Sequence, residues 1–216
     1  MDLNSLQYGN PDRSNKEFLT KESYLDGLLP ELTNYSFPPN DSQATQEEIL
    51  ELVSVTNTLG DNTELLRRFE IYDTSFDIYM TQSLSDKGGI PEDDIRELIK
   101  EVKEDTKPLL LKLKYHYQRP RPFQLSLLRG IELTPYSSFA ANSPSYPSGH
   151  TFQSRVYAEV LGNKYPQFHK ALHDLATDIM WSRIYMGVHY ASDCRFADYV
   201  AQVVCAHPEF RKKYKL

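Results

Sequence analysis

Apolar side chains recur at intervals of three and four residues along most of the chain, which is the period of an amphipathic helix. The pattern predicts helices over residues 45–56, 63–80, 151–161, 167–186 and 190–206, and a further helix from Pro91 that kinks or restarts at Pro108. Acidic residues directly after Pro91 suit the first turn of that helix. Strand-like alternation is sparse, so the pattern predicts an all-α bundle.

The remaining segments lack a clear period. Residues 1–23 are polar, and we expect an N-terminal arm there. Residues 24–43 are rich in proline and are predicted to be irregular surface chain, while Ser85–Gly89 is predicted to break a helix and residues 124–147 to form a long loop. We therefore expect one helical domain over residues 24–216, preceded by the arm.

Composition narrows the class of protein. The chain has 216 residues, of which 40% are hydrophobic, and this suits one globular domain. Its net charge of -6 argues against a nucleic-acid binder, whose phosphate contacts need a basic surface. No stretch approaches the roughly 20 apolar residues of a membrane span, and the first ten residues do not look like a signal peptide. We expect no integral membrane segment and a cytoplasmic location, or a periplasmic one if a signal was removed.

The two cysteines, Cys194 and Cys205, are eleven positions apart. On one helix that spacing separates them by about 16 Å, whereas a disulfide needs Cα atoms within about 7 Å. We expect two free thiols, as in a reducing compartment.

Cations with a suggestive spacing precede the predicted loop. Lys114 and Arg121 are two helical turns apart and can face the same side, where lysine and arginine together suit phosphate oxygens. Lys112 and Arg119 have the same spacing and form a competing register. A solvated basic face explains all four residues equally well.

A short turn then leads into a predicted helix. Free N–H groups at the start of a helix bind anions, Ser148 adds a hydroxyl group, and Gly149 lets the backbone come close. His150 would lie at the mouth of such a site and could protonate a leaving oxygen. An ordinary turn with a serine cap is the alternative interpretation.

A third segment contains Arg183, His189 and Asp193. The Asp193 carboxylate can bond one ring nitrogen of His189 and leave the other free to attack, as in a catalytic triad. A buried structural His–Asp pair is the alternative. All three segments lie within about 80 residues, and their roles interlock as phosphate cradle, nucleophile and acid.

Together these segments resemble the type-2 phosphatidic acid phosphatase superfamily. Its pattern of Lys-x6-Arg-Pro, Pro-Ser-Gly-His and Ser-Arg-x5-His-x3-Asp occurs here in order at 114–122, 147–150 and 182–193. The context at 117–123 and 145–151 is most similar to the soluble class A bacterial acid phosphatases. The resemblance implies the helical fold shared by acid phosphatases and vanadium-dependent haloperoxidases, over about residue 24 to the end. Pro144 departs from the class, which usually has glycine there.

The resemblance also implies roles for eight residues. His189 would form a phosphohistidine, Asp193 would orient it, and His150 would act as acid and then base. The phosphate would be held by Lys114, Arg121, Ser148, Gly149 and Arg183. We therefore expect a phosphoric monoester hydrolase acting on small phosphorylated substrates, with phosphotransferase activity and an acidic to near-neutral optimum. It would need no metal or cofactor, would be inhibited by vanadate, and could assemble as a homo-oligomer.

Two other functions fit the same motifs. A vanadate-dependent haloperoxidase would use vanadate as its cofactor in the same pocket, although such enzymes are usually much longer. A phosphate-binding protein without catalysis would need only the cations, whereas both histidines and Asp193 are present here.

Two further histidines, His169 and His173, are four positions apart and could contact a metal from one helix face. Such a site needs three or four ligands, and the sequence offers no nearby cysteine or third histidine. We therefore predict no metal site.

Overall fold

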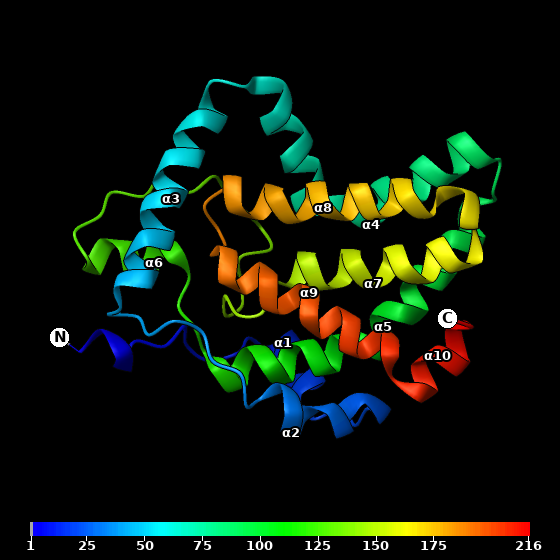
Figure 1. Ribbon diagram of the computed structural model, residues 1–216, viewed down its shortest axis with the longest axis horizontal. Helices are drawn as coiled ribbons and strands as arrows, with labels where there is room; N and C mark the ends of the chain where they lie inside the picture. The colour runs from blue at the N-terminus through cyan, green and yellow to red at the C-terminus, as the bar shows by residue number, and fades with distance from the viewer. Residues whose placement is uncertain (1) are drawn as a thin grey trace.

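The computed structural model describes residues 2–216, and within that range it is all-α, as predicted (Figure 1). Its helices are α1 (Arg13–Leu19), α2 (Leu29–Leu32), α3 (Gln43–Gly60), α4 (Thr63–Gly88), α5 (Glu92–Tyr117), α6 (Pro122–Leu128), α7 (Gly149–Lys164), α8 (His169–Tyr185), α9 (Ala191–Ala206) and α10 (Pro208–Tyr214). Short 3-10 turns occupy Leu3–Ser5, Tyr24–Leu28 and Pro166–Phe168. Over the described range, no helix combines the length and the apolar character that crossing a bilayer requires.

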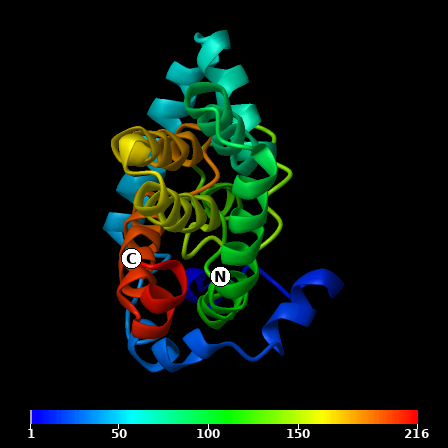
Figure 2. The same cartoon turned by 90° about the vertical axis from the view of Figure 1, so that its right-hand side faces the viewer.

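Helix α7 is the central helix of the bundle. It packs against α8 and α9 on either side, and against α5 and α4 as well (Figures 1 and 2). Most of its residues are buried, including Phe152, Val156, Tyr157 and Leu161, while a stripe with Arg155 and Glu159 is partly exposed. A helix with so wide an apolar face belongs in the core, and this one places its N-terminus inside the protein.

Helices α3 and α4 form a hairpin that rises above the bundle (Figure 1). Helix α4 is kinked at Ser75, whose backbone angles are φ -151° and ψ 31°, so its second half turns to follow α8. The helix break predicted at 85–89 comes only at its end, because α4 continues to Gly88 and Gly89 ends it with a left-handed φ of 62°.

Two segments predicted to be irregular contain helical turns. Within 24–43, the turn Tyr24–Leu28 and α2 anchor Leu25 and Leu32, which are fully buried. Within the predicted loop 124–147, the first residues belong to α6, whose first position is Pro122. These helices were missed because each is too short to show a hydrophobic period. The true loop runs from Arg129 to Ser148.

Residues 2–19 follow the surface of the bundle. Helix α1 packs against α5, and the Asn40 amide donates hydrogen bonds to the carbonyl groups of Leu3 and Leu6. The division into an arm over 1–23 and a domain over 24–216 stays a prediction. The two thiols are free, as expected, with Cys194 buried and Cys205 partly buried.

Candidate functional site

The three sequence motifs meet at one end of the helical bundle, where α5 ends and α7 and α9 begin. Lys114 lies in the last turn of α5, and His189 and Asp193 lie at the start of α9. A Cβ atom built on Gly149 would lie 3.6 Å from Cε of Lys114, so α5 and the start of α7 are in contact. All eight predicted residues belong to this cluster.

Asp193 is the most heavily bonded residue of the site. Its Oδ2 atom accepts hydrogen bonds from Nδ1 of His189 and from the backbone N–H of Tyr190, each at 3.0 Å, and from the hydroxyl of Ser145. Its Oδ1 atom accepts from a guanidinium nitrogen of Arg119 at 2.6 Å. A carboxylate held by four donors has one fixed position, so it fixes the imidazole of His189 in one orientation.

The other ring nitrogen of His189 carries its lone pair. Because Nδ1 donates to Asp193, Nε2 is left as the acceptor, and a guanidinium nitrogen of Arg121 lies 2.9 Å from it. Burial lowers the pKa of His189 well below its usual value, and the charges of Arg121 and Lys114 lower it further. The imidazole is therefore neutral, and its nucleophilic nitrogen points at the cations.

Two of the cations, Lys114 and Arg121, have no carboxylate partner in the part of the chain that the structure describes. Nζ of Lys114 donates to the carbonyl oxygen of Pro144 at 2.5 Å, and Arg121 donates to those of Ser143 at 2.8 Å and Val188 at 2.9 Å. Among residues 2–216 no ion pair joins either cation to an acid. Desolvation lowers the pKa of Lys114 well below its usual value and that of Arg121 to about 10. Two buried, uncompensated cations favour a bound anion.

Pro144, where the sequence departs from the class A pattern, contributes only its carbonyl group to this arrangement. Any residue can supply that acceptor, so the bond to Lys114 does not require the usual glycine.

Arg183, on α8, is held by an acid that lies outside the motifs. Its guanidinium is 2.7 Å from the carboxylate of Asp73 on α4, and it also donates to the hydroxyl of Ser138 at 3.1 Å. Asp73 in turn accepts from that hydroxyl and from the backbone N–H of Phe139. Sequence reasoning missed Asp73, although an acidic residue four positions after Phe69 and three before Phe76, on the apolar face of a predicted helix, was a usable signal.

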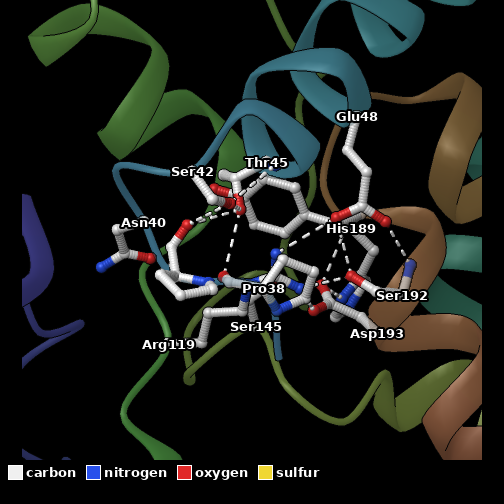
Figure 3. Close-up of polar contacts among 12 residues, drawn as sticks. Pro38, Asn40, Ser42, Thr45, Glu48, Arg119, Ser145, His189, Ser192 and Asp193 are labelled. Carbon is white, nitrogen blue, oxygen red and sulfur yellow. Dashed lines mark hydrogen bonds and ion pairs between the residues drawn. The ribbon is translucent and has the colours of Figure 1, made fainter. Parts of the chain in front are cut away.

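Arg119 has a partner in α3 that was also missed. Glu48 lies 3.2 Å from its guanidinium and accepts from both the backbone N–H and the hydroxyl of Ser192 at 2.7 Å (Figure 3). Arg119 stacks on the ring of Tyr190 at 3.7 Å and is fully buried. Arg119 therefore holds Asp193 in place. It does not face the phosphate cradle, which is the set of residues predicted to hold phosphate (Lys114, Arg121, Ser148, Gly149 and Arg183).

In the fold, the competing pair of cations, Lys112 and Arg119, does not lie together beside His189. Lys112 reaches the carboxylate of Asp26 at 2.7 Å, away from the cluster, while Arg119 is bound to acids. Lys114 and Arg121 are the pair that meets beside His189.

Ser148 is the N-cap of α7, as the alternative interpretation of this turn expected. Its oxygen accepts from the hydroxyl of Thr151 at 3.0 Å, and its N–H donates to the carbonyl of Asp193 at 3.1 Å. The next two amides, of Gly149 and His150, belong to the first turn, where N–H groups have no partner within the helix. They are aligned with the positive end of the α7 dipole.

His150 is half-buried and lies at the kink of α4. Its Nε2 atom is 3.1 Å from the backbone carbonyl of Asp73, so this nitrogen carries a hydrogen. Its ring lies against Phe76, with centroids 5.1 Å apart. Burial lowers the pKa of His150 well below its usual value, Arg183 and His189 lower it further, and the bond to Asp73 partly opposes them.

The donor set around His189 suits an anion better than a metal ion. The nearby carboxylates, Asp193 and Asp73, are each paired with an arginine, and lysine and arginine cannot act as ligands when charged.

The model of the PAP2 superfamily matches residues 106–207. That range includes all eight residues predicted from the motifs and leaves out Glu48 and Asp73. No curated protein matches the chain.

Proposed function

We propose that this chain, whose residues 106–207 belong to the PAP2 superfamily, is a phosphomonoesterase that works without a metal ion, through a phosphohistidine on His189. Membership of the superfamily indicates phosphatase or phosphotransferase activity in general. The finer assignment, to an acid phosphatase of the class A type with a broad range of small phosphate esters, is our inference from the site.

One observation carries the proposal: Lys114 and Arg121 are buried directly beside a neutral imidazole, with no acidic partner in the described part of the chain. A phosphoryl group supplies the missing negative charge and can accept hydrogen bonds from both side chains. Arg183 and the amides at the start of α7 offer further donors for its oxygens. The cradle thus supplies the positive charge that a metal ion contributes in other phosphatases.

In the first step, Nε2 of His189 attacks the phosphorus atom. The bond from phosphorus to the ester oxygen breaks, and that oxygen leaves as an alcohol with a proton from His150. Asp193 stabilises the positive charge that develops on the imidazole of His189. The products of the step are a phosphohistidine, a neutral His150 and a free alcohol.

In the second step, a water molecule gives its proton to His150 and attacks the phosphohistidine. The bond from Nε2 to phosphorus breaks, and inorganic phosphate leaves. An alcohol in place of water would produce a new phosphate ester, so the proposal includes phosphotransferase activity. Vanadate, which adopts the five-coordinate geometry of the transition state, would bind the same cradle as an inhibitor.

The test has two parts. The first is hydrolysis of p-nitrophenyl phosphate at pH 5 to 7 in excess EDTA. The second is labelling of the protein by a ³²P-phosphate ester, after which the stability of the label is measured in acid and in base. We expect activity that resists EDTA, and a label with the base stability of phosphohistidine. His189→Ala should lose both, whereas His116→Ala, which changes an exposed histidine outside the cradle, should keep both. EDTA-sensitive activity, or a label that persists in His189→Ala, would overturn the proposal.

A further inference from the structure

A second cluster of chemically reactive side chains lies at the opposite end of the α7–α8 pair. Glu159 on α7 and His169 and His173 on α8 each place one potential ligand atom within 4.8 Å of the others. Glu159 is ten positions from Gly149, and His173 is ten from Arg183, so about 15 Å of helix separates this cluster from the phosphate cradle. It is therefore independent of the proposed phosphatase site.

The third ligand comes from the fold, since Glu159 belongs to a different helix from the two histidines. Helices α7 and α8 are antiparallel and are joined by the short turn Pro166–Phe168 (Figure 1). The rings of His169 and His173 lie on one face of α8, with centroids 4.4 Å apart. The antiparallel packing brings the Glu159 carboxylate to that face.

The spacing of two of the three donor atoms suits a tetrahedral ion. Nε2 of His173 lies 3.3 Å from a carboxylate oxygen of Glu159, and yet this enclosed nitrogen makes no hydrogen bond with any described residue. Two ligand atoms bound to one tetrahedral zinc ion at about 2.0–2.1 Å are themselves about 3.3 Å apart. The two groups are thus separated as ligands of a common ion would be.

A glycine keeps the first histidine close to α7. A Cβ atom built on Gly162 would lie 2.9 Å from Cδ2 of His169 and 3.2 Å from its Cα. A larger residue at position 162 would push the start of α8 away from α7, so this glycine permits the approach that the cluster needs.

We propose that Glu159, His169 and His173 form a zinc-binding site that joins α7 to α8. Two imidazoles and one carboxylate are a donor set that zinc prefers, with water or another ligand in the fourth position. The site borders a cleft of about 500 Å³ that Glu159 and His173 help to line. The guanidinium of Arg155, which donates to the backbone carbonyl of His173 at 3.3 Å, is paired with Asp198 at 2.7 Å, and this pairing reduces its repulsion of a metal ion.

The test uses the full chain, freed of metal with a chelator and then titrated with Zn²⁺ by calorimetry and with Co²⁺ by visible absorption. We expect one ion per chain, the strong absorption of tetrahedral Co²⁺, and a higher melting temperature with Zn²⁺. Mg²⁺ and Ca²⁺, which prefer oxygen ligands, should not produce these changes. His173→Ala and Glu159→Gln should each weaken Zn²⁺ binding at least tenfold.

The controls separate this site from other histidines. His207→Ala and His150→Ala should bind Zn²⁺ as the unmodified chain does. If His173→Ala fails to fold, Glu159→Gln carries the test, because that carboxylate is 40% exposed and its loss leaves no cavity. The proposal is overturned if the unmodified chain binds no Zn²⁺, if Glu159→Gln binds it unchanged, or if His150→Ala abolishes binding.

Discussion

Asp73 of α4 and Arg183 of α8 form a fully buried ion pair, with 2.7 Å between carboxylate oxygen and guanidinium nitrogen. The same carboxylate holds the loop that contains Ser138 and Phe139, and the backbone carbonyl of Asp73 holds His150. One residue outside the matched range 106–207 therefore positions two of the residues proposed to act on phosphate.

Replacing that acid should destabilise the protein and make its stability depend more strongly on phosphate. Asp73→Ala leaves Arg183 buried without a counter-charge, so we expect a loss of about 3–5 kcal/mol in the free energy of unfolding. Phosphate, which can replace the missing charge, should raise the melting temperature of the variant more than that of the unmodified chain. Thermal unfolding with and without phosphate measures both effects.

The matched control on the same helix is Glu70→Ala, an exposed residue whose loss should change the free energy of unfolding by no more than about 0.5 kcal/mol. Equal stabilisation of Asp73→Ala and the unmodified chain by phosphate would contradict a role for Arg183 in binding it.

Glu48 should act on the rate through Arg119 and Asp193. Glu48→Gln keeps the shape of the side chain but removes the charge that holds Arg119 and Ser192. We expect kcat to fall about tenfold, equivalent to about 1.4 kcal/mol of transition-state stabilisation, with KM nearly unchanged because the phosphate cradle is untouched. Steady-state kinetics of this variant and of Glu47→Gln, its exposed neighbour on α3, make the comparison. A rise in KM at constant kcat would show that Glu48 affects substrate binding instead.

The pH optimum of kcat/KM should lie at acidic pH. His189 must be neutral to attack, and its lowered pKa keeps it neutral to well below pH 6.5. His150 must be protonated to act as an acid. Because its pKa is lowered, it loses that proton at a pH below 6.5 as the pH rises. Activity should therefore peak on the acid side and fall as the pH rises toward neutrality. A kcat/KM profile measured from pH 3.5 to 8 checks this, and an optimum above pH 7 would contradict these two roles.

The buried charge of Lys114 should lower the stability of the folded protein but be required for its activity. The residue is 3% exposed, and its ammonium group has no carboxylate partner within 4 Å among residues 2–216, so Lys114→Met removes a charge that is costly to bury. We expect the free energy of unfolding to rise by about 1 kcal/mol, while kcat/KM falls at least a hundredfold. Chemical denaturation and steady-state kinetics measure the two changes.

Lys112→Met is the control, because that lysine has Asp26 as its partner and lies away from the cradle. It should lose no activity and gain no stability. A Lys114→Met variant that is less stable than the unmodified chain would show that the bond to the carbonyl of Pro144 outweighs the cost of burying the charge.

Much of the fold could be predicted because helices are specified locally. The period of apolar residues placed α3, the first part of α4, α5, α7, α8 and α9, and the spacing of four between His189 and Asp193 already allowed their hydrogen bond. Helices as short as α2 and α6 were not predicted, since four to seven residues do not display a period. The full length of α4 was not predicted either, because its end depends on Gly89 adopting a left-handed conformation.

By itself, the sequence determined the all-α class and the chemical identity of the cluster around His189, since both depend on residue types at short spacing. Only the tertiary structure decided which charges are compensated. Asp73 and Glu48 reach Arg183 and Arg119 from α4 and α3, and Glu159 reaches His173 across the α7–α8 hairpin. Pairs that are distant in the chain are set by how helices pack, and no local spacing records that.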